Sequence, residues 1–588
     1  LRVHFNEDVT LIFGCGGDRD VRKRSIMAKI AKKYCNKIYI TDDNPRNENP
    51  KKIRKTLMSN LKGSNVKEIG DRSSAIQHAM KNTKPYEVIL IAGKGHENFQ
   101  IYKKNIINIS DKSIIKNTKI KKLKFSKQDK IFDQNSKILN KILKTNKSYK
   151  FKGISINSKE VKKNNLFVAI KGPRNDGHDF VKNALNAGAS YCVVSQKVKG
   201  VNIKKLIKYN NTKNFLNRFS LAKRDKTEAK VLAITGSAGK TTVKTILGKL
   251  LSLYDNTCYS PKSFNNHYGV PLSLSNLEKN DKFGVFEVGM SRPGEINNLT
   301  KLIKPDLALI TNIAEAHIEN FRNLKDIAKA KGEIINNICK NGTIVLNKDD
   351  KFYNYFKTLA KNKNLKVISF SKLNKADVCI LDKKVIKNKQ VLKIQVINEV
   401  IILEQNKMNI YNMLSIFAVL KHLGLKLNKI KNKLNLFKNI EGRGKTYNVK
   451  RYNTRFNLVD ESYNANPLSV KNAIHNLSNL KINGNKKYLL LGDMLELGNK
   501  SNFYHKNISK LINKTDIDKV FVYGDKVLNT FKYTKKNKQG NILQHQNDFD
   551  LVFSNIIKKG DYLMIKGSNS TGLNILTSKI IKGQANVI

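Results

Sequence analysis

The sequence predicts a multi-domain α/β protein built from mostly parallel sheets. Its 588 residues exceed one compact domain and, at roughly 100–200 residues per domain, correspond to about four. Short apolar runs alternate with helical stretches along nearly the whole chain, which is the pattern of parallel α/β domains. Hydrophobic residues make up 40% and charged residues 27%, so the chain has enough apolar material for several cores.

The charge balance is strongly basic. Lys and Arg number 111 against 46 Asp and Glu, a formal net charge of +65, which excludes an acidic, solvating protein. A basic excess of this size raises the possibility of a nucleic-acid partner. The basic residues are mostly Lys, however, spread along the chain among Asn and Ile without an aromatic-interleaved stripe. We therefore attribute the charge to a composition bias and expect no specific nucleic-acid partner.

Cysteine spacing and hydropathy indicate a cytoplasmic protein. No two of the six cysteines form a C-x-x-C pair, which argues against a zinc ribbon or a disulfide scaffold and for a reducing compartment. No apolar run approaches the ~18–20 residues that span a bilayer, and no signal peptide opens the chain. The chain starts at Leu1 without a Met and enters a strand almost at once, so we expect it to be part of a longer protein.

The first predicted domain has three apolar strands that each run into a polar loop. The predicted strands are Val9–Phe13, Lys37–Thr41 and Glu87–Ala92. Open α/β sheets bind their ligands at the carboxyl ends of the strands. The last domain repeats this plan with Lys487–Leu491 and Val520–Tyr523, each before a Gly-Asp pair, and with Tyr562–Ile565 before Lys566-Gly567-Ser568. The two ends of the chain are therefore predicted to be copies of one domain type.

Composition shifts divide the chain between these ends. Residues 119–147 are rich in Lys and Asn and are interpreted as a linker plus the start of a new unit. A small α/β unit and a large domain follow it. The predicted boundaries are 1–115 for the first domain, 116–149 for the linker, 150–226 for the small unit, 227–440 for the large domain and 441–588 for the last domain.

The large domain contains the strongest motif, a phosphate-binding loop. The strand Val231–Thr235 precedes Gly236-Ser237-Ala238-Gly239-Lys240-Thr241-Thr242, and an amphipathic helix runs on to Leu251. Glycines let backbone N–H groups turn toward a phosphate chain, and a helix N-terminus favours its charge. Lys240 is expected to reach the β- and γ-phosphates, and Thr241 to offer its hydroxyl to Mg²⁺. ATP and Mg²⁺ are therefore the predicted cofactors.

Two further strand ends in this domain suit a metal site. Phe283–Phe286 is followed by Glu287, and Leu307–Thr311 is followed by Asn312, with His317 just beyond. A carboxylate and an imidazole beside a phosphate loop can complete a Mg²⁺ sphere and offset charge that develops in phosphoryl transfer. Taken alone, Glu287 is as readily structural as functional, and a lone His is more often a surface or core residue. Their position after strands of the phosphate-loop domain favours the metal site for both.

Six strings in order resemble the Mur ligases over residues 150–588, and within that family the members that add D-alanyl-D-alanine to UDP-N-acetylmuramoyl-tripeptide. The last two strings are specific to those members. The strings are Thr235–Thr242, Asn265-Asn266 with Gly269-Val270-Pro271, Phe286-Glu287-Val288-Gly289-Met290, Asn312-Ile313-Ala314-Glu315-Ala316-His317, Asp460-Glu461-Ser462-Tyr463-Asn464-Ala465-Asn466-Pro467 and Leu491-Gly492-Asp493-Met494-Leu495-Glu496-Leu497-Gly498. The resemblance implies a small UDP-sugar-binding domain, a central P-loop ATPase-type domain and a Rossmann-like C-terminal domain.

The resemblance also implies roles for individual residues. Lys240, Lys331, His317 and Glu287 are the expected catalytic residues, and Thr241, Glu287, His317 and Lys331 the expected metal ligands, with Lys331 carbamylated. The expected ATP-binding residues are Gly236, Ser237, Ala238, Gly239, Lys240, Thr241, Thr242, Asn312, Asn409, Asn412, Arg443, Asp460 and Glu461. The expected substrate-binding residues are Ser155, Ser158, Asn265, Asn266, Tyr463, Asn464 and Asn466. The family pattern is not followed at Asn157, Lys159, Met408 and Glu461.

The first 115 residues resemble the third domain of the preceding Mur ligase, of the type that adds meso-diaminopimelate. The strings are Gly14–Asp20, Asp43-Asn44-Pro45-Arg46 and Ala92-Gly93-Lys94-Gly95-His96-Glu97. Arginines can grip a carboxylate in a fork, and a glutamate can pair with an ammonium group. The chain is therefore interpreted as the tail of one ligase fused to the whole of the next. The expected remnant of the amino-acid site is Arg19, Asn44, Arg46, Gly93 and Glu97.

The implied reaction is ATP-dependent amide formation in peptidoglycan precursor synthesis, through an acyl phosphate of the UDP-linked tripeptide. Three alternatives stay open at this point. One is another ligase of the superfamily, of folylpolyglutamate or cyanophycin type, and one is a nucleic-acid-binding P-loop protein. In the third, the first segment serves only to tether the chain to other peptidoglycan-precursor enzymes.

Overall fold

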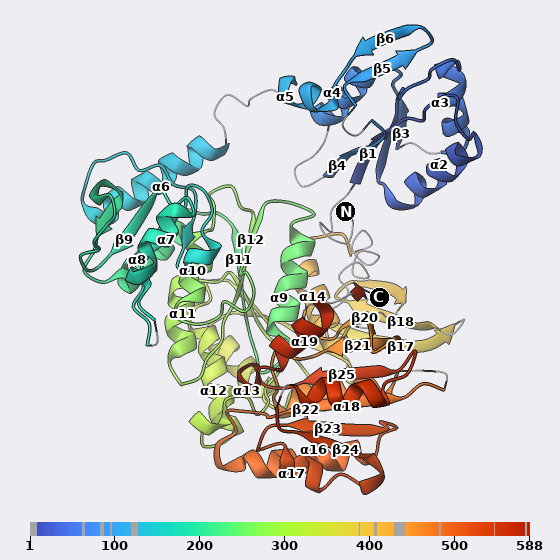
Figure 1. The fold of residues 1–588 in the computed structure, drawn as a ribbon. Helices are drawn as coiled ribbons and strands as arrows, with labels where there is room; N and C mark the ends of the chain where they lie inside the picture. Colours follow the sequence, from blue (N-terminus) through green and yellow to red (C-terminus); the bar gives the residue numbers. More distant parts are fainter. Residues whose placement is uncertain are drawn as a thin grey trace. The chain divides into compact units, whose positions relative to one another are not determined.

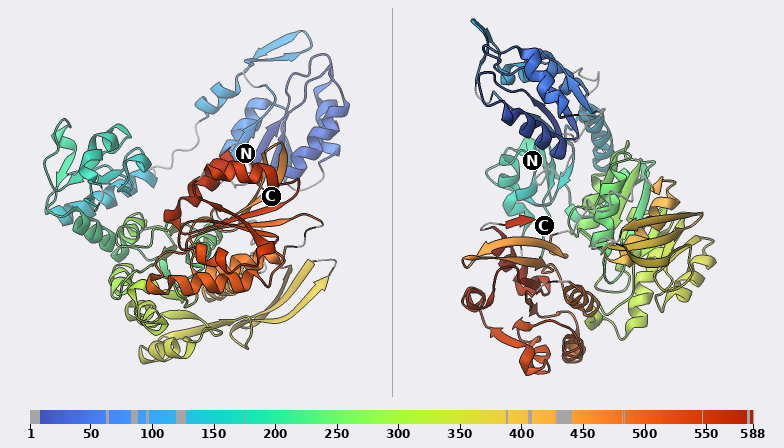
Figure 2. Two further views of the ribbon diagram at one scale, coloured as in Figure 1. Left: turned by 60° about the horizontal axis from the view of Figure 1, so that its bottom comes forward. Right: turned by 90° about the vertical axis from the view of Figure 1, so that its right-hand side faces the viewer.

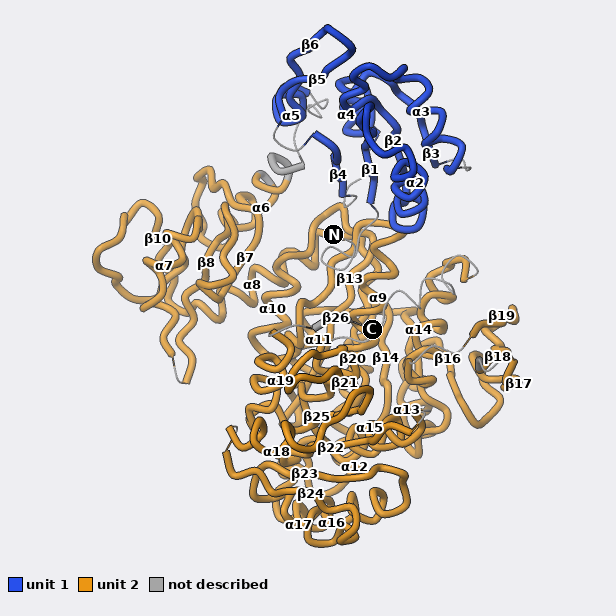
Figure 3. The backbone as a smooth tube through the Cα atoms, turned by 45° about the vertical axis from the view of Figure 1, so that its right-hand side comes forward, with its two compact units in different colours: residues 1–130 blue, residues 131–588 orange. Residues whose placement is uncertain are grey.

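The computed structural model describes residues 9–587 except 62–64, 83–87, 95–96, 119–126, 174, 387–388, 405–407, 428–440, 481, 483, 546 and 583–584. Gly95 and His96 of the first domain's third string thus lie outside the described residues. The chain divides into unit 1, residues 1–130, and unit 2, residues 131–588 (Figure 3).

Unit 1 is built on a parallel sheet of four strands in the order β3-β2-β1-β4. The apolar strand β1 is buried along its whole length and lies at the centre. One apolar cluster lies under α2 and α3 and another under α4, so helices cover both faces. A hairpin, β5-β6, and the helix α5 follow the sheet. The bounds are β1 (Val9–Phe13), α2 (Arg22–Tyr34), β2 (Lys37–Ile40), α3 (Pro50–Ser59), β3 (Val66–Glu68), α4 (Arg72–Asn82), β4 (Val88–Ile91), β5 (Phe99–Tyr102), β6 (Asn105–Asn108) and α5 (Asp111–Asn117).

The helix α6 (Lys127–Leu143) crosses the boundary at residue 130, and most of it belongs to unit 2. A small parallel sheet in the order β10-β9-β8-β7 follows it. Ile138, Leu139 and Ile142 of α6 are buried in the core of this sheet. The linker predicted over 116–149 is therefore wrong for its helical part, because an apolar stripe at helical spacing is hidden there among many Lys and Asn residues. The bounds are β7 (Ile154–Ser155), β8 (Leu166–Val168), α7 (Val181–Asn186), β9 (Tyr191–Val194), β10 (Leu206–Lys208) and α8 (Thr212–Asp225).

The central sheet has nine strands in the order β12-β13-β11-β14-β15-β16-β17-β18-β19. It is parallel as far as β17 and ends in an antiparallel meander, drawn in yellow in Figures 1 and 2. The strands are β11 (Lys230–Thr235), β12 (Thr257–Tyr259), β13 (Phe283–Glu287), β14 (Leu307–Ile310), β15 (Thr343–Asn347), β16 (Lys366–Ser371), β17 (Val378–Ile386), β18 (Lys389–Val396) and β19 (Glu399–Glu404). The helices are α9 (Lys240–Leu251), α10 (Gly269–Ser275), α11 (Glu295–Ile303), α12 (Leu324–Gly332), α13 (Tyr353–Asn362) and α14 (Ile410–His422).

The last sheet has seven strands in the order β24-β23-β22-β25-β21-β20-β26. Helices α15 and α16 contribute to one apolar cluster and α18 and α19 to another, so both faces are covered (Figure 2). The strands are β20 (Lys445–Arg451), β21 (Thr454–Asp460), β22 (Lys487–Gly492), β23 (Lys519–Tyr523), β24 (Gln539–Leu543), β25 (Tyr562–Lys566) and β26 (Ala585–Val587). The helices are α15 (Pro467–Ser478), α16 (Ser501–Ile512), α17 (Leu528–Lys532), α18 (Asp548–Ile556) and α19 (Leu573–Lys582).

The observed architecture confirms the predicted fold class. The strands predicted from apolar runs are present within one residue at each end wherever the chain is described. The order β3-β2-β1-β4 in unit 1 repeats the order β24-β23-β22-β25 at the other end of the chain. Among the described residues, no helix combines the length and the apolar character that crossing a membrane requires.

Candidate active site

The phosphate loop connects β11, at the middle of the parallel part of the central sheet, to the N-terminus of α9. Gly236 and Gly239 both have positive φ, 144° and 84°, which only glycine adopts without strain. A Cβ at Gly236 would lie 1.9 Å from Thr311 Oγ1, and one at Gly239 would lie 2.5 Å from Asn412 Oδ1. Both glycines are therefore required by conformation and by space.

Lys240 and Lys331 point at the same carbonyl of this loop. Lys240 Nζ donates to Gly236 O at 2.6 Å, and Lys331 Nζ donates to it at 3.2 Å. Burial lowers the pKa of Lys331 well below its usual value, and the charge of Lys240 lowers it further. The neighbouring Lys329, by contrast, is exposed and lies 3.8 Å from Asp326. Lys331, and not Lys329, thus faces the phosphate loop.

Glu287 lies at the end of β13, beside the phosphate loop, because β13 pairs in parallel with β11. It is almost fully buried. Its Oε2 accepts a hydrogen bond from Thr241 Oγ1 at 2.7 Å, and its Oε1 accepts one from Asn265 Nδ2 at 2.8 Å. Thr241 Oγ1 also lies 3.1 Å from Ser263 Oγ. A carboxylate and a hydroxyl are therefore held together next to Lys240.

Asn312 follows β14 and shapes the phosphate loop. Its Oδ1 accepts from Ala238 N at 2.9 Å, and its Nδ2 donates to Ala238 O at 3.1 Å. Ser237 Oγ in turn donates to Ala314 O and accepts from Ala314 N, both at 2.8 Å. The Asn312 amide, which was predicted to bind ATP, thus hydrogen-bonds the phosphate loop itself.

His317 lies in the loop after β14 and faces the last domain. Its Nδ1 is 2.7 Å from Glu496 Oε2. Contact with His317 lowers the pKa of the Glu496 carboxyl. Glu496 belongs to the string Leu491–Gly498, but its place beside His317 depends on how two domains meet, which no local pattern reveals.

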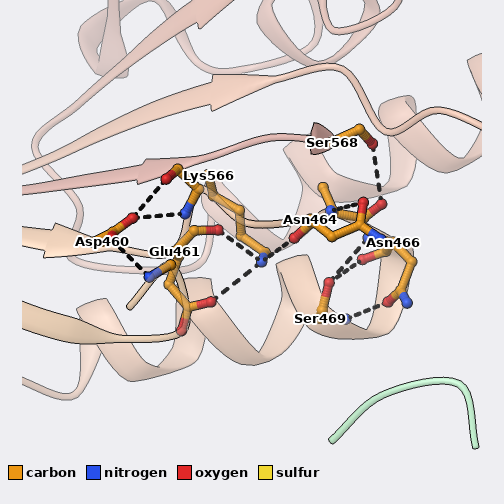
Figure 4. A network of polar contacts seen from close by, with 10 residues as sticks. Asp460, Glu461, Asn464, Asn466, Ser469, Lys566 and Ser568 are labelled. Carbon is orange, nitrogen blue, oxygen red and sulfur yellow. Dashed lines mark hydrogen bonds and ion pairs between the residues drawn. The ribbon is translucent and has the colours of Figure 1, made fainter. Parts of the chain in front are cut away.

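Arg443 and the loop after β21 form the wall of the site on the side of the last domain. The Arg443 guanidinium lies over the Tyr463 ring at 4.5 Å and donates to Ser263 Oγ at 3.4 Å. Asn466 Nδ2 donates to Ser237 O of the phosphate loop at 3.3 Å. The Oδ1 of Asn466 caps α15 in a capping box with Ser469 (Figure 4).

Asp460 was predicted to bind ATP, but its carboxylate hydrogen-bonds the adjoining loops and does not line the cleft. It accepts from Gly442 N at 2.7 Å and from Ser462 Oγ at 2.6 Å. Asp460 therefore shapes the loops that present Arg443 and Tyr463. Its neighbour Glu461 does line the cleft and contacts Lys566. The sequence predicts only that Lys566 follows a strand and indicates no role for it in the site.

Asn409, just before α14, and Asn412, in its first turn, make different contacts beside the site. Asn409 is the N-cap of α14 and accepts from Tyr411 N at 2.9 Å. Asn412 lies against Gly239, since a Cβ at Gly239 would be 2.5 Å from Asn412 Oδ1. Both line the cleft.

The structure separates the predicted substrate residues into two groups. Asn265, Asn266, Tyr463, Asn464 and Asn466 all line the cleft. Ser155 and Ser158 do not. Ser155 Oγ donates to Asn157 O at 2.9 Å, within its own turn.

These side chains surround a cleft of about 2020 Å³ within unit 2. Its volume exceeds the ~300–1,000 Å³ of a pocket for one small molecule, so it has room for a nucleotide and further substrates. Residues from the central and the last domain line it. They include Ser237, Ala238, Gly239, Lys240, Thr241, Thr242, Glu287, Asn312, His317, Lys331, Arg443 and Glu461.

The donors in this cleft fit Mg²⁺. Among the residues that the structure describes, no three or more His, Cys, Asp or Glu side chains form a metal cage. Mg²⁺ does not need one, because it is usually held by one or two carboxylates together with substrate phosphates and water. The pair formed by Glu287 and Thr241 beside the phosphate loop matches that mode.

Unit 1 brings its own three strings together at the carboxyl end of its sheet. Asn44 Nδ2 donates to Glu97 Oε2 at 2.7 Å, and Arg46 Nη1 donates to Gly17 O at 2.8 Å. A Cβ at Gly93 would lie 2.6 Å from Asp43 Oδ2, so the glycine allows this close approach. Arg19 is exposed in the first of the three loops.

Comparisons with known proteins match both ends and the middle of the chain to domains of one family. The family model described as the Mur ligase middle domain matches residues 234–420, and that of the Mur ligase family, catalytic domain matches residues 150–223. The model of the Mur ligase, glutamate ligase domain matches twice, at residues 1–95 and 448–569. Both ends of the chain therefore carry this last domain type, as the repeated strand order indicates.

Relatives and solved structures agree with these matches. The UDP-N-acetylmuramoyl-tripeptide–D-alanyl-D-alanine ligase of Rickettsia prowazekii is 30% identical over 428 residues, which are 72% of this chain and 93% of that protein. The ligase of the same name from Buchnera aphidicola subsp. Acyrthosiphon pisum is 32% identical over 441 residues, 73% and 93% of the two chains. The crystal structure of MurF ligase from Thermotoga maritima in complex with ADP has 27% identity and a TM-score of 0.61, and covers 73% and 97%. The chain therefore belongs to the Mur ligase family.

Proposed function

We propose that the chain joins D-alanyl-D-alanine to UDP-N-acetylmuramoyl-tripeptide with hydrolysis of ATP, as a cytoplasmic step of peptidoglycan precursor synthesis. The observation that carries this proposal is the cluster of Lys240, Lys331 and the Thr241–Glu287 pair around one phosphate loop. Its support from similarity is the set of relatives with this activity, whose lengths the chain spans almost completely.

The chemistry requires an activated carboxylate, because a carboxylate does not condense with an amine at neutral pH. The γ-phosphoryl group of ATP moves to the tripeptide carboxylate and gives an acyl phosphate. The amine of D-alanyl-D-alanine attacks the acyl carbon, and the tetrahedral intermediate expels phosphate. Lys240 and the backbone N–H groups of residues 239–241, at the N-terminus of α9, stabilise the charge on the transferring group.

Glu287, Thr241 and His317 are the side chains that would hold Mg²⁺, together with the nucleotide phosphates. Held there, Mg²⁺ would supply positive charge to offset that of the phosphates. Lys331 would complete the set as a carbamate. Burial lowers the pKa of Lys331 and so increases the share of neutral amine, which adds CO₂ with loss of one proton to give an anionic side chain.

Arg443, Tyr463, Asn464 and Asn466 would bind from the side of the last domain, where the nucleotide and the incoming dipeptide meet. Their place on the cleft wall supports this role. In unit 1, Arg46, Asn44 and Glu97 would form the remnant of a diaminopimelate site with Arg19 and Gly93. The shared loop edge and the second match to the glutamate ligase domain support that assignment.

Phosphate release from the purified chain with ATP and Mg²⁺ tests the proposal, with the UDP-linked tripeptide and D-alanyl-D-alanine added separately and together. We expect turnover only with both, faster with the diaminopimelate tripeptide than with the lysine tripeptide, and faster still with added bicarbonate if Lys331 is carbamylated. Turnover that ignores both substrates but rises with RNA or DNA would reject the ligase and favour a polyanion-binding ATPase.

A further inference from the structure

Lys566, at the end of β25, is a buried lysine that the proposed mechanism leaves unused. Only 2% of its side chain is exposed. Its Nζ donates to Asn464 O at 3.0 Å and to Glu461 Oε2 at 3.3 Å, and lies 3.5 Å from Glu461 O (Figure 4). Burial lowers the pKa of this lysine, while the Glu461 carboxylate opposes the change. Lysine side chains are almost never fully buried unless they are paired, because an unpaired buried charge is strongly destabilising.

All of these partners belong to one short segment, residues 461–466, which connects β21 to α15. The segment contacts the phosphate loop through a hydrogen bond from Asn466 Nδ2 to Ser237 O. It also presents the Tyr463 ring to Arg443. Through its contacts with Glu461 and Asn464, Lys566 ties the start and the middle of this segment to β25.

Other contacts from the same strand end hold the segment in the same way. Ser568 Oγ donates to Ala465 O at 3.3 Å and accepts from Leu495 N at 2.9 Å. Asn569 Nδ2 donates to Tyr463 O at 3.2 Å. Lys566 differs from these neighbours because it carries a charge and makes several contacts with the segment at once. Hydrogen bonds from a charged donor are roughly twice as strong as neutral ones.

We propose that Lys566 is a positioning residue of the active site, which fixes the backbone of residues 461–466 so that Asn466 and Tyr463 meet the phosphate loop and Arg443. This inference rests on the proposed ligase function. Lys566 borders the cleft, but its Nζ is engaged by Glu461 and Asn464, so its removal should disturb geometry rather than remove a contact to ATP. A displacement of about 1 Å in a positioned group can cost about 100-fold in rate.

The chain offers a matched control in Lys487, a buried lysine of the same sheet. Its side chain is 4% exposed, and its Nζ donates to Asp516 Oδ2 and to Ser478 O, both at 2.5 Å. It lies at the start of β22, whereas Lys566 lies at the end of the paired strand β25. Lys487→Met therefore removes a similar buried charge at the opposite end of the sheet.

The experiment compares Lys566→Met with Lys487→Met in the full chain, by phosphate release under saturating substrates, ADP titration and thermal melting. We expect kcat to fall roughly 100-fold in K566M, with an unchanged Kd for ADP, and to stay within about twofold of wild type in K487M. A wild-type kcat in K566M, or an equal loss in both variants, would overturn the inference. If K566M does not fold, K566R and K487R take the place of the two variants. An equal kcat in K566R and K487R would likewise overturn the inference.

Hydrogen exchange separates this inference from the proposed function. In folded K566M the amides of residues 461–466 should exchange faster than in wild type, and in K487M they should not. Unchanged exchange in K566M would overturn the inference even if the enzyme is a ligase. Conversely, if wild type shows no turnover dependent on both substrates, the proposed function fails, and the exchange data still decide what Lys566 does.

Discussion

At the scale of single residues, the site is built from side chains that hold one another before any ligand binds. Glu287 is the clearest case, since both of its oxygens accept hydrogen bonds, from Thr241 and from Asn265. A carboxylate arranged in this way is fixed in direction and remains an acceptor for a cation. Its charge, rather than its shape, is what the proposed chemistry would use.

Glu287→Gln tests that distinction, because glutamine retains the size and one acceptor oxygen but loses the charge. We expect kcat to fall by roughly 100-fold or more, since a charged group beside the transferring phosphoryl is lost. Binding of ADP without Mg²⁺ should be nearly unchanged. Steady-state kinetics and ADP titrations at several Mg²⁺ concentrations provide the measurement, and a kcat close to wild type would remove Glu287 from the metal site.

At the scale of elements, the strand, loop and helix around residues 230–251 form a unit whose shape depends on two glycines. The positive φ at Gly239 places the N-terminus of α9 where phosphates can approach it, and Asn412 fills the space beside it. Sequence spacing predicts the glycines, but not that α14 packs directly against one of them.

Gly239→Ala combines a strained φ with a clash, and Gly294→Ala provides the matched control. Gly294 has a φ of 85°, but a Cβ there would meet nothing within 4 Å. Each substitution should cost about 1–2 kcal/mol in the free energy of unfolding through φ alone. Only G239A should also weaken nucleotide binding, by roughly tenfold or more, since a hydrogen bond to a charged group contributes about 1.5–3 kcal/mol and about 1.4 kcal/mol is tenfold. Equal nucleotide affinities in the two variants would contradict the role of Gly239.

A second prediction at this scale concerns η2 (Gly177–Phe180), the short helix of the small sheet domain. His178 Nε2 accepts from Ser195 N at 3.0 Å, so its Nδ1 carries the proton and faces Asp176 Oδ1 at 2.5 Å. Hydrogen bonds from the His178 backbone N–H and ring lower the pKa of Asp176 below 3.8. The aspartate therefore stabilises the folded state above pH 3.8, and this contribution is lost as the pH falls through its folded pKa.

Asp176→Asn should accordingly lower the free energy of unfolding by roughly 1 kcal/mol at pH 7. The difference from wild type should shrink as the pH falls below 3.8. Urea unfolding at a series of pH values measures it. Asp179→Asn, in the same short helix but exposed, is the control and should change little at any pH. A loss in D176N that does not depend on pH would contradict the assignment.

At the scale of the whole molecule, the chain contains one complete set of ligase domains and a second copy of the last one. The cleft and every side chain assigned to the proposed reaction lie in unit 2. The apolar cluster that joins the central and the last sheet also lies entirely within it. Unit 1 has its own core clusters.

A protein of residues 131–588 should therefore fold and retain kcat for the ligase reaction within about twofold, as expected when no group near the chemistry is removed. Thermal melting and the phosphate-release assay check this. Aggregation of the shortened protein, or a kcat lowered tenfold or more, would show that unit 1 contributes to the fold or the reaction of unit 2.

Much of this could be predicted from the sequence because the relevant signals are local. Apolar runs of four to six residues mark β1, β11 and β22, and the glycine spacing after β11 marks the phosphate loop. The helix α6 was not predicted, because many Lys and Asn residues lie between its apolar positions and the composition indicated a linker. Ser155 and Ser158 matched a family pattern but lie outside the cleft, since a pattern carries no distance.

What the sequence determined by itself was therefore the fold class, the repeated domain, the phosphate loop and the family. Only the tertiary structure decided which polar residues line the cleft and which hydrogen-bond the loops around it. It assigned Asp460 and Asn312 to shaping loops, distinguished Lys331 from Lys329, and brought Glu496 to His317 and Lys566 to residues 461–466. The physical reason is that helices and strands form from neighbours along the chain, whereas the partner of a buried charge is set by packing between segments tens to hundreds of residues apart.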